Sequence, residues 1–262
     1  MKRIARVAAL LAAFTACAPA LGSGTREGEL RLRVAGNGPV TVVFEAGLGD
    51  TLDVWRNVQD QVASGCARTV TYSRAGYPGS GKAVGHRDAV TIVSELRVEL
   101  TARGVAPPYV LVAHSLGGLY AQFYARSFPD EVAGLVLVDS THWDQLARIQ
   151  AEAPAMYGTL KVASLLMFGT MRKEFVDSVA AGAQVKEAPE SSRIPAIVLS
   201  STRAAPGETP AFRGLMHTLQ DEIAAEYGAL RHDFVPGSGH YIQRDRPGAV
   251  IGAIRELAGC SS

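Results

Sequence analysis

Residues 109–129 read YVLVAHSLGGLYAQFYARSFP, and two structural patterns meet in this stretch at Ser115. Up to Ala113 the residues form an apolar run typical of a buried strand, and from Leu116 the apolar residues recur at helical spacing. A serine between a strand and a helix can be held in a strained turn that lifts its hydroxyl clear of the sheet. The residues two positions away must then be small. Ala113 and Gly117 meet this requirement, so the stretch predicts a nucleophile elbow with Ser115 as the nucleophile.

The rest of the chain alternates β-branched segments with amphipathic ones. This alternation favours an α/β fold with a mostly parallel sheet and helices on both faces. Residues 141–192 interrupt the pattern, because they are apolar but irregular, and they predict a small helical cap inserted over the sheet. An ordinary helix with long loops is the alternative. Strands are predicted at 29–36, 40–47, 68–76, 109–113, 132–140 and 194–201, and a last strand ends within 231–240. Further helices are predicted at 51–64, 86–104 and 246–259.

The N-terminal tract resembles a secretory signal over residues 1–20, ahead of a folded domain at 25–262. It has three basic residues, then an apolar run at 7–14 that is too short to span a membrane, then small residues. Two cleavage sites are open: a lipoprotein signal cut before Cys17, or ordinary cleavage after the small residues at 18–20. A genuine N-terminal helix is a third interpretation. We therefore expect an exported protein that is periplasmic, extracellular or lipid-anchored at the cell envelope.

The net charge of the chain indicates which classes of binding partner to expect. The formal net charge is +1, but removing the N-terminal tract leaves 23 basic and 25 acidic groups. Such a chain lacks the basic surface that nucleic-acid binding requires, so we expect no nucleic-acid partner. Contact with a membrane is expected only through a lipid anchor on Cys17.

Four motifs in a fixed order resemble the α/β-hydrolase family: FEAG at 44–47, SRAGYPGSG at 73–81, HSLGG at 114–118 and GSGHYIQRDRP at 237–247. The resemblance covers roughly residues 28–258. It implies a serine hydrolase with an eight-stranded, mostly parallel sheet and no metal or organic cofactor. The serine at the elbow argues against relatives that use an aspartate there, the epoxide hydrolases and haloalkane dehalogenases.

The base and the acid of a catalytic triad follow from this resemblance. His240 follows a predicted strand through a flexible GSG near the C-terminus, where the family keeps its histidine; an ordinary surface turn is the alternative. The family's acid usually follows the seventh strand, yet no acid appears there before Glu208. The other family position, after the sixth strand, holds Asp139, which we predict as the acid although it could merely cap a turn. Glu208 is the first alternative, followed by Asp221, Glu222 and Asp233.

Acyl transfer also needs donors for an oxyanion. We expect the backbone N–H groups of Leu116, just after the nucleophile, and Leu48, by family position. Glu45 and Arg74 end strands that the fold places side by side, and we expect an ion pair that braces the loop at Leu48. A solvated Glu45 is the alternative.

Two cysteines remain after the signal. In the α/β-hydrolase fold, the helix at 51–64 and the C-terminal helix cover the same face of the sheet. Cys66 and Cys260 follow these two helices, so the resemblance predicts a disulfide between them far from Ser115. Export would permit it. Two isolated thiols are the alternative.

These expectations combine into an exported carboxylic-ester hydrolase that acts through an acyl-serine intermediate on a small-molecule ester with an apolar portion. The apolar portion is suggested by six cap residues, Met156, Tyr157, Leu165, Leu166, Met167 and Phe168. An amidase, lactonase or peptidase would use the same triad. A non-catalytic binding protein with the same fold is the third class.

Overall fold

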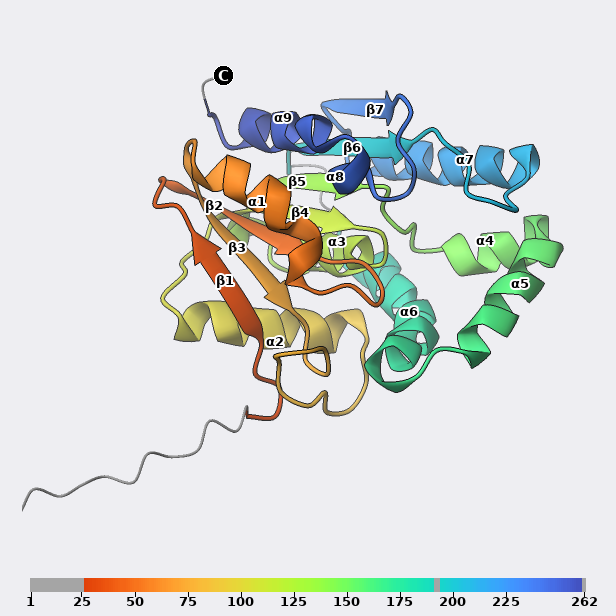
Figure 1. Ribbon diagram of the computed structural model, residues 1–262, viewed down its shortest axis with the longest axis horizontal. Coiled ribbons are helices and arrows are strands. Elements are labelled where there is room, and N and C mark those ends of the chain that lie inside the picture. Colours follow the sequence, from red (N-terminus) through yellow and green to blue (C-terminus); the bar gives the residue numbers. More distant parts are fainter. Residues whose placement is uncertain (1–25, 191–193, 261–262) are drawn as a thin grey trace, which may run out of the picture.

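A seven-stranded sheet forms the centre of the part of the chain that the computed structural model describes, residues 26–190 and 194–260 (Figure 1). The spatial order is β1-β3-β2-β4-β5-β6-β7. β1 pairs with β3 in antiparallel orientation and all other pairs are parallel. The strands are β1 (Arg31–Ala35), β2 (Val40–Glu45), β3 (Ala67–Ser73), β4 (Tyr109–His114), β5 (Val132–Val138), β6 (Ala196–Ser201) and β7 (Arg231–Val235).

The prediction of eight strands was wrong for the described residues. Only β1 precedes β2 there, because residues 26–30 do not extend into a second edge strand. They turn at Gly28, which has a φ of 73°, and its backbone N–H donates to the carbonyl of Lys82. The antiparallel end of the sheet therefore contains a single strand.

Helices cover both faces of the sheet, as the alternating pattern predicted. α1 and α9 pack together on one face, while α2 and α3 pack together on the other (Figure 1). The helices are α1 (Arg56–Ala63), α2 (Ala89–Ala102), α3 (Gly117–Ser127), α4 (Gln145–Glu152), α5 (Pro154–Leu165), α6 (Gly169–Glu187), α7 (Pro210–Glu226), α8 (Ile242–Asp245) and α9 (Pro247–Leu257).

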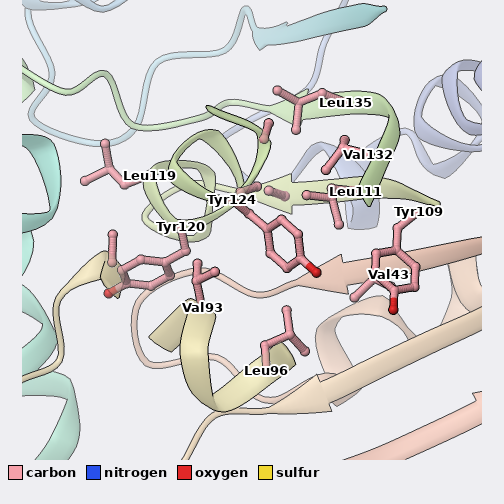
Figure 2. Close-up of a cluster of buried hydrophobic side chains, with 14 of the residues drawn as sticks. Val43, Val93, Leu96, Tyr109, Leu111, Leu119, Tyr120, Tyr124, Val132 and Leu135 are labelled. Atoms are coloured by element: carbon pink, nitrogen blue, oxygen red, sulfur yellow. The ribbon is translucent and has the colours of Figure 1, made fainter. Parts of the chain in front are cut away.

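The strand period of two divides the apolar side chains between two cores. In β4, Leu111 belongs to the core under α2 and α3, and its neighbours Val110 and Val112 belong to the core under α1 and α9. Figure 2 shows the first core, in which Tyr124 of α3 lies near Val93 of α2. Strands β2, β4 and β5 are buried on both faces, which accounts for their continuous apolar sequences.

Three helices, α4, α5 and α6, lie between β5 and β6. They occupy the side of the molecule toward which the arrows of β4, β5 and β6 point (Figure 1). This is the region predicted as a cap at 141–192, of which residues 191–192 lie outside the described residues, as do the predicted signal at 1–20 and Cys17. No helix within the described ranges is long and apolar enough to cross a membrane.

A disulfide joins Cys66, which follows α1, to Cys260, which follows α9. Their Cα atoms are 5.8 Å apart, although 194 positions separate them in the sequence. The contact between α1 and α9 brings the two ends together. The cross-link therefore ties the C-terminal helix to the early part of the sheet.

Candidate active site

Ser115 lies in the turn between β4 and α3. Its φ is +52°, a strained value for a residue with a side chain. Two glycines permit the turn: a Cβ on Gly117 would lie 2.4 Å from the carbonyl oxygen of Ala46, and one on Gly118 would lie 1.7 Å from Oγ of Ser140. The small residues of this motif are thus required by close packing against β2 and the end of β5.

Three predicted site residues meet at this turn. Oγ of Ser115 lies 2.9 Å from Nε2 of His240, and Nδ1 of His240 lies 2.7 Å from Oδ2 of Asp139. Ser115 follows β4, Asp139 follows β5 and His240 follows β7, so three strand ends supply the set. With the proton on Nδ1 facing the carboxylate, Nε2 is free to accept the serine proton.

Asp139 is held firmly. It has a φ of +44°, and its Oδ1 and Oδ2 accept the backbone N–H and the hydroxyl of Ser201, each at 2.9 Å. Burial acts to raise the pKa of Asp139, but the hydrogen bonds from His240 and Ser201 hold it below its usual value. The carboxylate therefore remains ionised beside the imidazole.

The other candidate acids lie apart from His240. Glu208 accepts from the guanidinium of Arg213 and from the backbone N–H of Ala205. Asp221 lies beside His232, Glu222 beside Arg148 and His142, and Asp233 beside Arg231. The geometry therefore favours Asp139 over all four.

His114 supports His240 from behind. Its ring is buried, and its Nε2 lies 2.9 Å from the backbone oxygen of His240, to which it donates. Burial lowers the pKa of His114 to about 3, so the ring is neutral. The neutral ring therefore holds the backbone of His240 through this one hydrogen bond.

The model of the alpha/beta hydrolase family matches residues 42–253, a range that contains Ser115, Asp139 and His240. The chain belongs to this family. Solved structures similar to this chain include an esterase from Thermogutta terrifontis, with 20% identity, a TM-score of 0.57 and coverage of 88% of this chain and 93% of that one. Another is the enol-lactonase from Burkholderia xenovorans LB400, with 17% identity, a TM-score of 0.59 and coverage of 88% and 96%. At these identities the likeness shows the fold alone.

The curated proteins similar to this chain include the uncharacterized protein YqjL of Bacillus subtilis (strain 168). The two are 36% identical over 104 residues, which are 40% of this chain and 41% of YqjL. The match therefore spans less than half of that relative.

The loop after β2 lies next to the elbow and contains Leu48. Within the described residues, the backbone N–H groups of Leu48 and Leu116 donate to no backbone or side-chain acceptor. The expected ion pair beside this loop is confirmed: Nη1 of Arg74 lies 2.6 Å from Oε1 of Glu45, and both side chains are buried. Arg74 also donates to the backbone oxygens of Ala46 and Gly47.

A pocket of about 480 Å³ opens at Ser115 and His240. Its apolar wall comes from α4, α5 and α7, with Ile149, Leu160, Phe212 and Met216. None of the six apolar cap residues singled out in the sequence lines it. Leu165, Leu166 and Phe168 instead point to solvent, with Phe168 82% exposed.

No three His, Cys, Asp or Glu side chains within residues 26–190 and 194–260 are grouped as a metal ion would require.

Sequence reasoning missed two polar residues around the site, Ser201 and Glu174. Ser201 ends β6, beside the position where the family acid was expected. Glu174 belongs to α6, and its partner Arg74 is 100 positions away; neither residue type nor local spacing marks such a contact.

Proposed function

We propose that this protein is an exported serine hydrolase that cleaves carboxylic esters through an acyl-serine intermediate. The observation that carries the proposal is the continuous line of contacts from Ser115 through His240 to Asp139, at the mouth of a pocket. A serine hydroxyl is unreactive without a base, and an imidazole oriented by a carboxylate is such a base.

The reaction has two halves. In the first, Oγ of Ser115 attacks the ester carbonyl carbon while Nε2 of His240 takes the hydroxyl proton. The backbone N–H groups of Leu48 and Leu116 stabilise the oxyanion, and collapse expels the alcohol, which receives the proton from His240. In the second, His240 deprotonates a water that attacks the acyl carbon. The bond from that carbon to Oγ then breaks, His240 returns the proton to Oγ of Ser115, and the acid leaves. Asp139 stabilises the imidazolium in both halves.

The pocket supports a substrate with an apolar portion. Its apolar wall, Ile149, Leu160, Phe212 and Met216, faces the space beside Ser115. The side chain of His240 is 48% exposed, so water can reach the acyl-serine for the second half of the reaction. Both features fit an esterase that accepts small esters.

The disulfide between Cys66 and Cys260 supports export, because disulfides persist mainly in oxidising compartments outside the cytosol. A signal at residues 1–20 would provide the route. Mass spectrometry of the protein purified from its cell envelope would separate ordinary cleavage from a lipid on Cys17.

A fluorophosphonate probe tests the function, with Ser115→Ala as the control. We expect labelling of the wild type alone and loss of p-nitrophenyl ester hydrolysis in Ser115→Ala by a factor on the order of 10⁶. Aminoacyl arylamides and a lactone belong in the same assay, since one structural relative is named an enol-lactonase. Faster arylamide or lactone turnover would replace the ester assignment, and an unlabelled wild type would favour a non-catalytic binding protein.

A further inference from the structure

The guanidinium of Arg74 lies buried one residue past the end of β3, and it donates hydrogen bonds in three directions. Nη1 donates to Glu45 at 2.6 Å and to the backbone oxygen of Ala46 at 2.7 Å. Nη2 donates to the backbone oxygen of Gly47 at 2.8 Å. The remaining donors point away from the sheet, toward the cap. Arg74 therefore fixes residues 46 and 47, at the start of the loop that carries Leu48.

Glu174 of α6 accepts these remaining donors. Its two carboxylate oxygens lie 2.8 Å from Nε and Nη2 of Arg74, and the side chain is fully buried. Such a two-point pair between arginine and carboxylate fixes orientation as well as distance. The pair joins the cap to the sheet, because Glu174 belongs to α6 of the cap and Arg74 directly follows strand β3.

A second route joins the same carboxylate to the same loop. The hydroxyl of Tyr77 donates to Oε2 of Glu174 at 2.7 Å and accepts the backbone N–H of Gly49 at 3.1 Å. Residues 46 and 47 are thus bonded to Glu174 through Arg74, and residue 49 is bonded to it through Tyr77. Leu48 lies between the two attachments.

The first turns of α6 also pack directly on this region. A Cβ on Gly49 would lie 2.9 Å from Sδ of Met171, and one on Gly76 would lie 1.9 Å from Oγ1 of Thr170. Glycine at both positions allows α6 to approach closely, at Gly49 in the loop and at Gly76 in the neighbouring turn after β3. Hydrogen bonds therefore reach residues 46, 47 and 49 of the loop, and the packing of α6 reaches residue 49.

We propose that Glu174 is a positioning residue, through which the cap sets the backbone of residues 46–49 and aims the N–H of Leu48 at the oxyanion. The inference rests on the proposed function. Glu174 touches neither the substrate nor Ser115, so it acts on turnover through Arg74 and Tyr77. A cap usually serves to shape a pocket; here it also supports a catalytic donor from behind.

Asp177, one turn further along α6, offers a matched control. It also bonds the cap to the rest of the fold, because it accepts the backbone N–H of Arg87 at 2.6 Å, but it has no contact with residues 46–49 in the described structure. Glu174→Gln and Asp177→Asn each replace a carboxylate of α6 with an amide of the same shape. Only the first change reaches the loop.

We expect Glu174→Gln to lower kcat for a p-nitrophenyl ester about tenfold to hundredfold with KM within about twofold, because small misplacements of catalytic groups have effects of this size. Amide hydrogen exchange at residues 47–50 should become faster. Asp177→Asn should change kcat less than about twofold and leave that exchange unchanged. If Glu174→Gln does not fold, Tyr77→Phe removes only the route to Gly49, and it should give a several-fold loss of kcat.

An unchanged kcat in Glu174→Gln or Tyr77→Phe, or equal losses in Glu174→Gln and Asp177→Asn, would overturn the proposal. So would unaltered exchange at residues 47–50. Failure of the esterase assignment has a different signature, a wild type that fluorophosphonate does not label. The exchange comparison still decides in that case whether Glu174 holds the loop.

Discussion

Two arginine–carboxylate networks flank Ser115, and they differ in burial. On the oxyanion side, Arg74 lies fully buried between Glu45 and Glu174. On the acid side, Arg213 of α7 pairs with Glu208 and donates to the hydroxyl of Ser201 at 3.0 Å, with its side chain 15% exposed and lining the pocket. One network is closed inside the protein, and the other borders the pocket beside Ser115.

The difference separates two ways of supporting a catalytic group. A buried charge without its partner is costly, so the Arg74 network holds its loop only while all its members are present. Arg213 reaches Asp139 through one hydroxyl, since Ser201 accepts from Arg213 and donates in turn to Asp139. Asp139 also has the backbone N–H of Ser201 and His240 as partners, so its position depends less on the arginine.

The largest expected effect lies on the acid side, at Asp139 itself. Asp139→Asn should lower kcat for a p-nitrophenyl ester by about 10⁴-fold, because an amide cannot hold the imidazole in the tautomer that leaves Nε2 free. Steady-state kinetics at neutral pH measures this. Glu208→Gln is the control, and we expect a loss of less than about tenfold. A crippled Glu208→Gln enzyme with an active Asp139→Asn enzyme would move the acid to Glu208.

The second prediction compares how much each arginine contributes to the free energy of unfolding. Arg74→Met should lower the free energy of unfolding by about 3–5 kcal/mol, because it leaves two buried carboxylates without their cation. Arg213→Met should cost about 1 kcal/mol, since its pair with Glu208 is partly exposed to the pocket. Urea denaturation of both variants gives the comparison. Equal losses would show that the two networks do not differ in the way their exposure indicates.

The sequence predicted the side chains nearest the chemistry better than those that support them. Ser115 and His240 have local signals, a strand-to-helix junction with small neighbours and a glycine-rich turn near the C-terminus. Asp139 needed the order of the strands as well. Glu174 could not be found, because its contact with Arg74 depends on how the cap folds back over the sheet.

The errors in the fold have the same origin. The eight strands were carried over from the family, whereas the local patterns indicated seven strand segments, and the described residues form a seven-stranded sheet. The exposure of Leu165, Leu166 and Phe168 likewise depends on the tertiary placement of the end of α5 and the turn that follows it, which apolar composition does not determine. Local patterns gave the elements and the elbow; packing decided the rest.

Removing the disulfide would test whether a loss of stability alone lowers the activity. Cys66 and Cys260 lie at the far ends of α1 and α9, and neither belongs to a network around Ser115. A Cys66→Ala/Cys260→Ala variant should lose about 3 kcal/mol of unfolding free energy. Its kcat should remain within about twofold of the wild type at a temperature where it stays folded. A tenfold lower kcat would mean that general loosening, rather than a specific network, accounts for losses such as that expected in Glu174→Gln.

The smallest expected effect is a pH dependence of stability that comes from Glu45 in the Arg74 network. Burial raises the pKa of Glu45 to about 7 from its ordinary 4.5, against the opposing influence of Arg74. Between about pH 4.5 and 7 the unfolded chain gives up this proton while the folded protein keeps it, so this group makes stability fall as pH rises through that window. Above pH 7 its contribution is constant. Glu45→Gln stays neutral throughout and lacks this slope.

The unfolding free energy of Glu45→Gln relative to the wild type should therefore rise by on the order of 2 kcal/mol from pH 4.5 to pH 7.5. Urea denaturation at intervals across this range measures the difference, and titrations common to both proteins cancel. A flat difference would mean that Glu45 remains ionised beside Arg74 at low pH. Glu45 would then contribute no pH dependence to stability in this range, and Arg74 would hold it charged despite its burial. A rise in the difference would mean that Glu45 takes up a proton inside the buried Arg74 network as the pH falls.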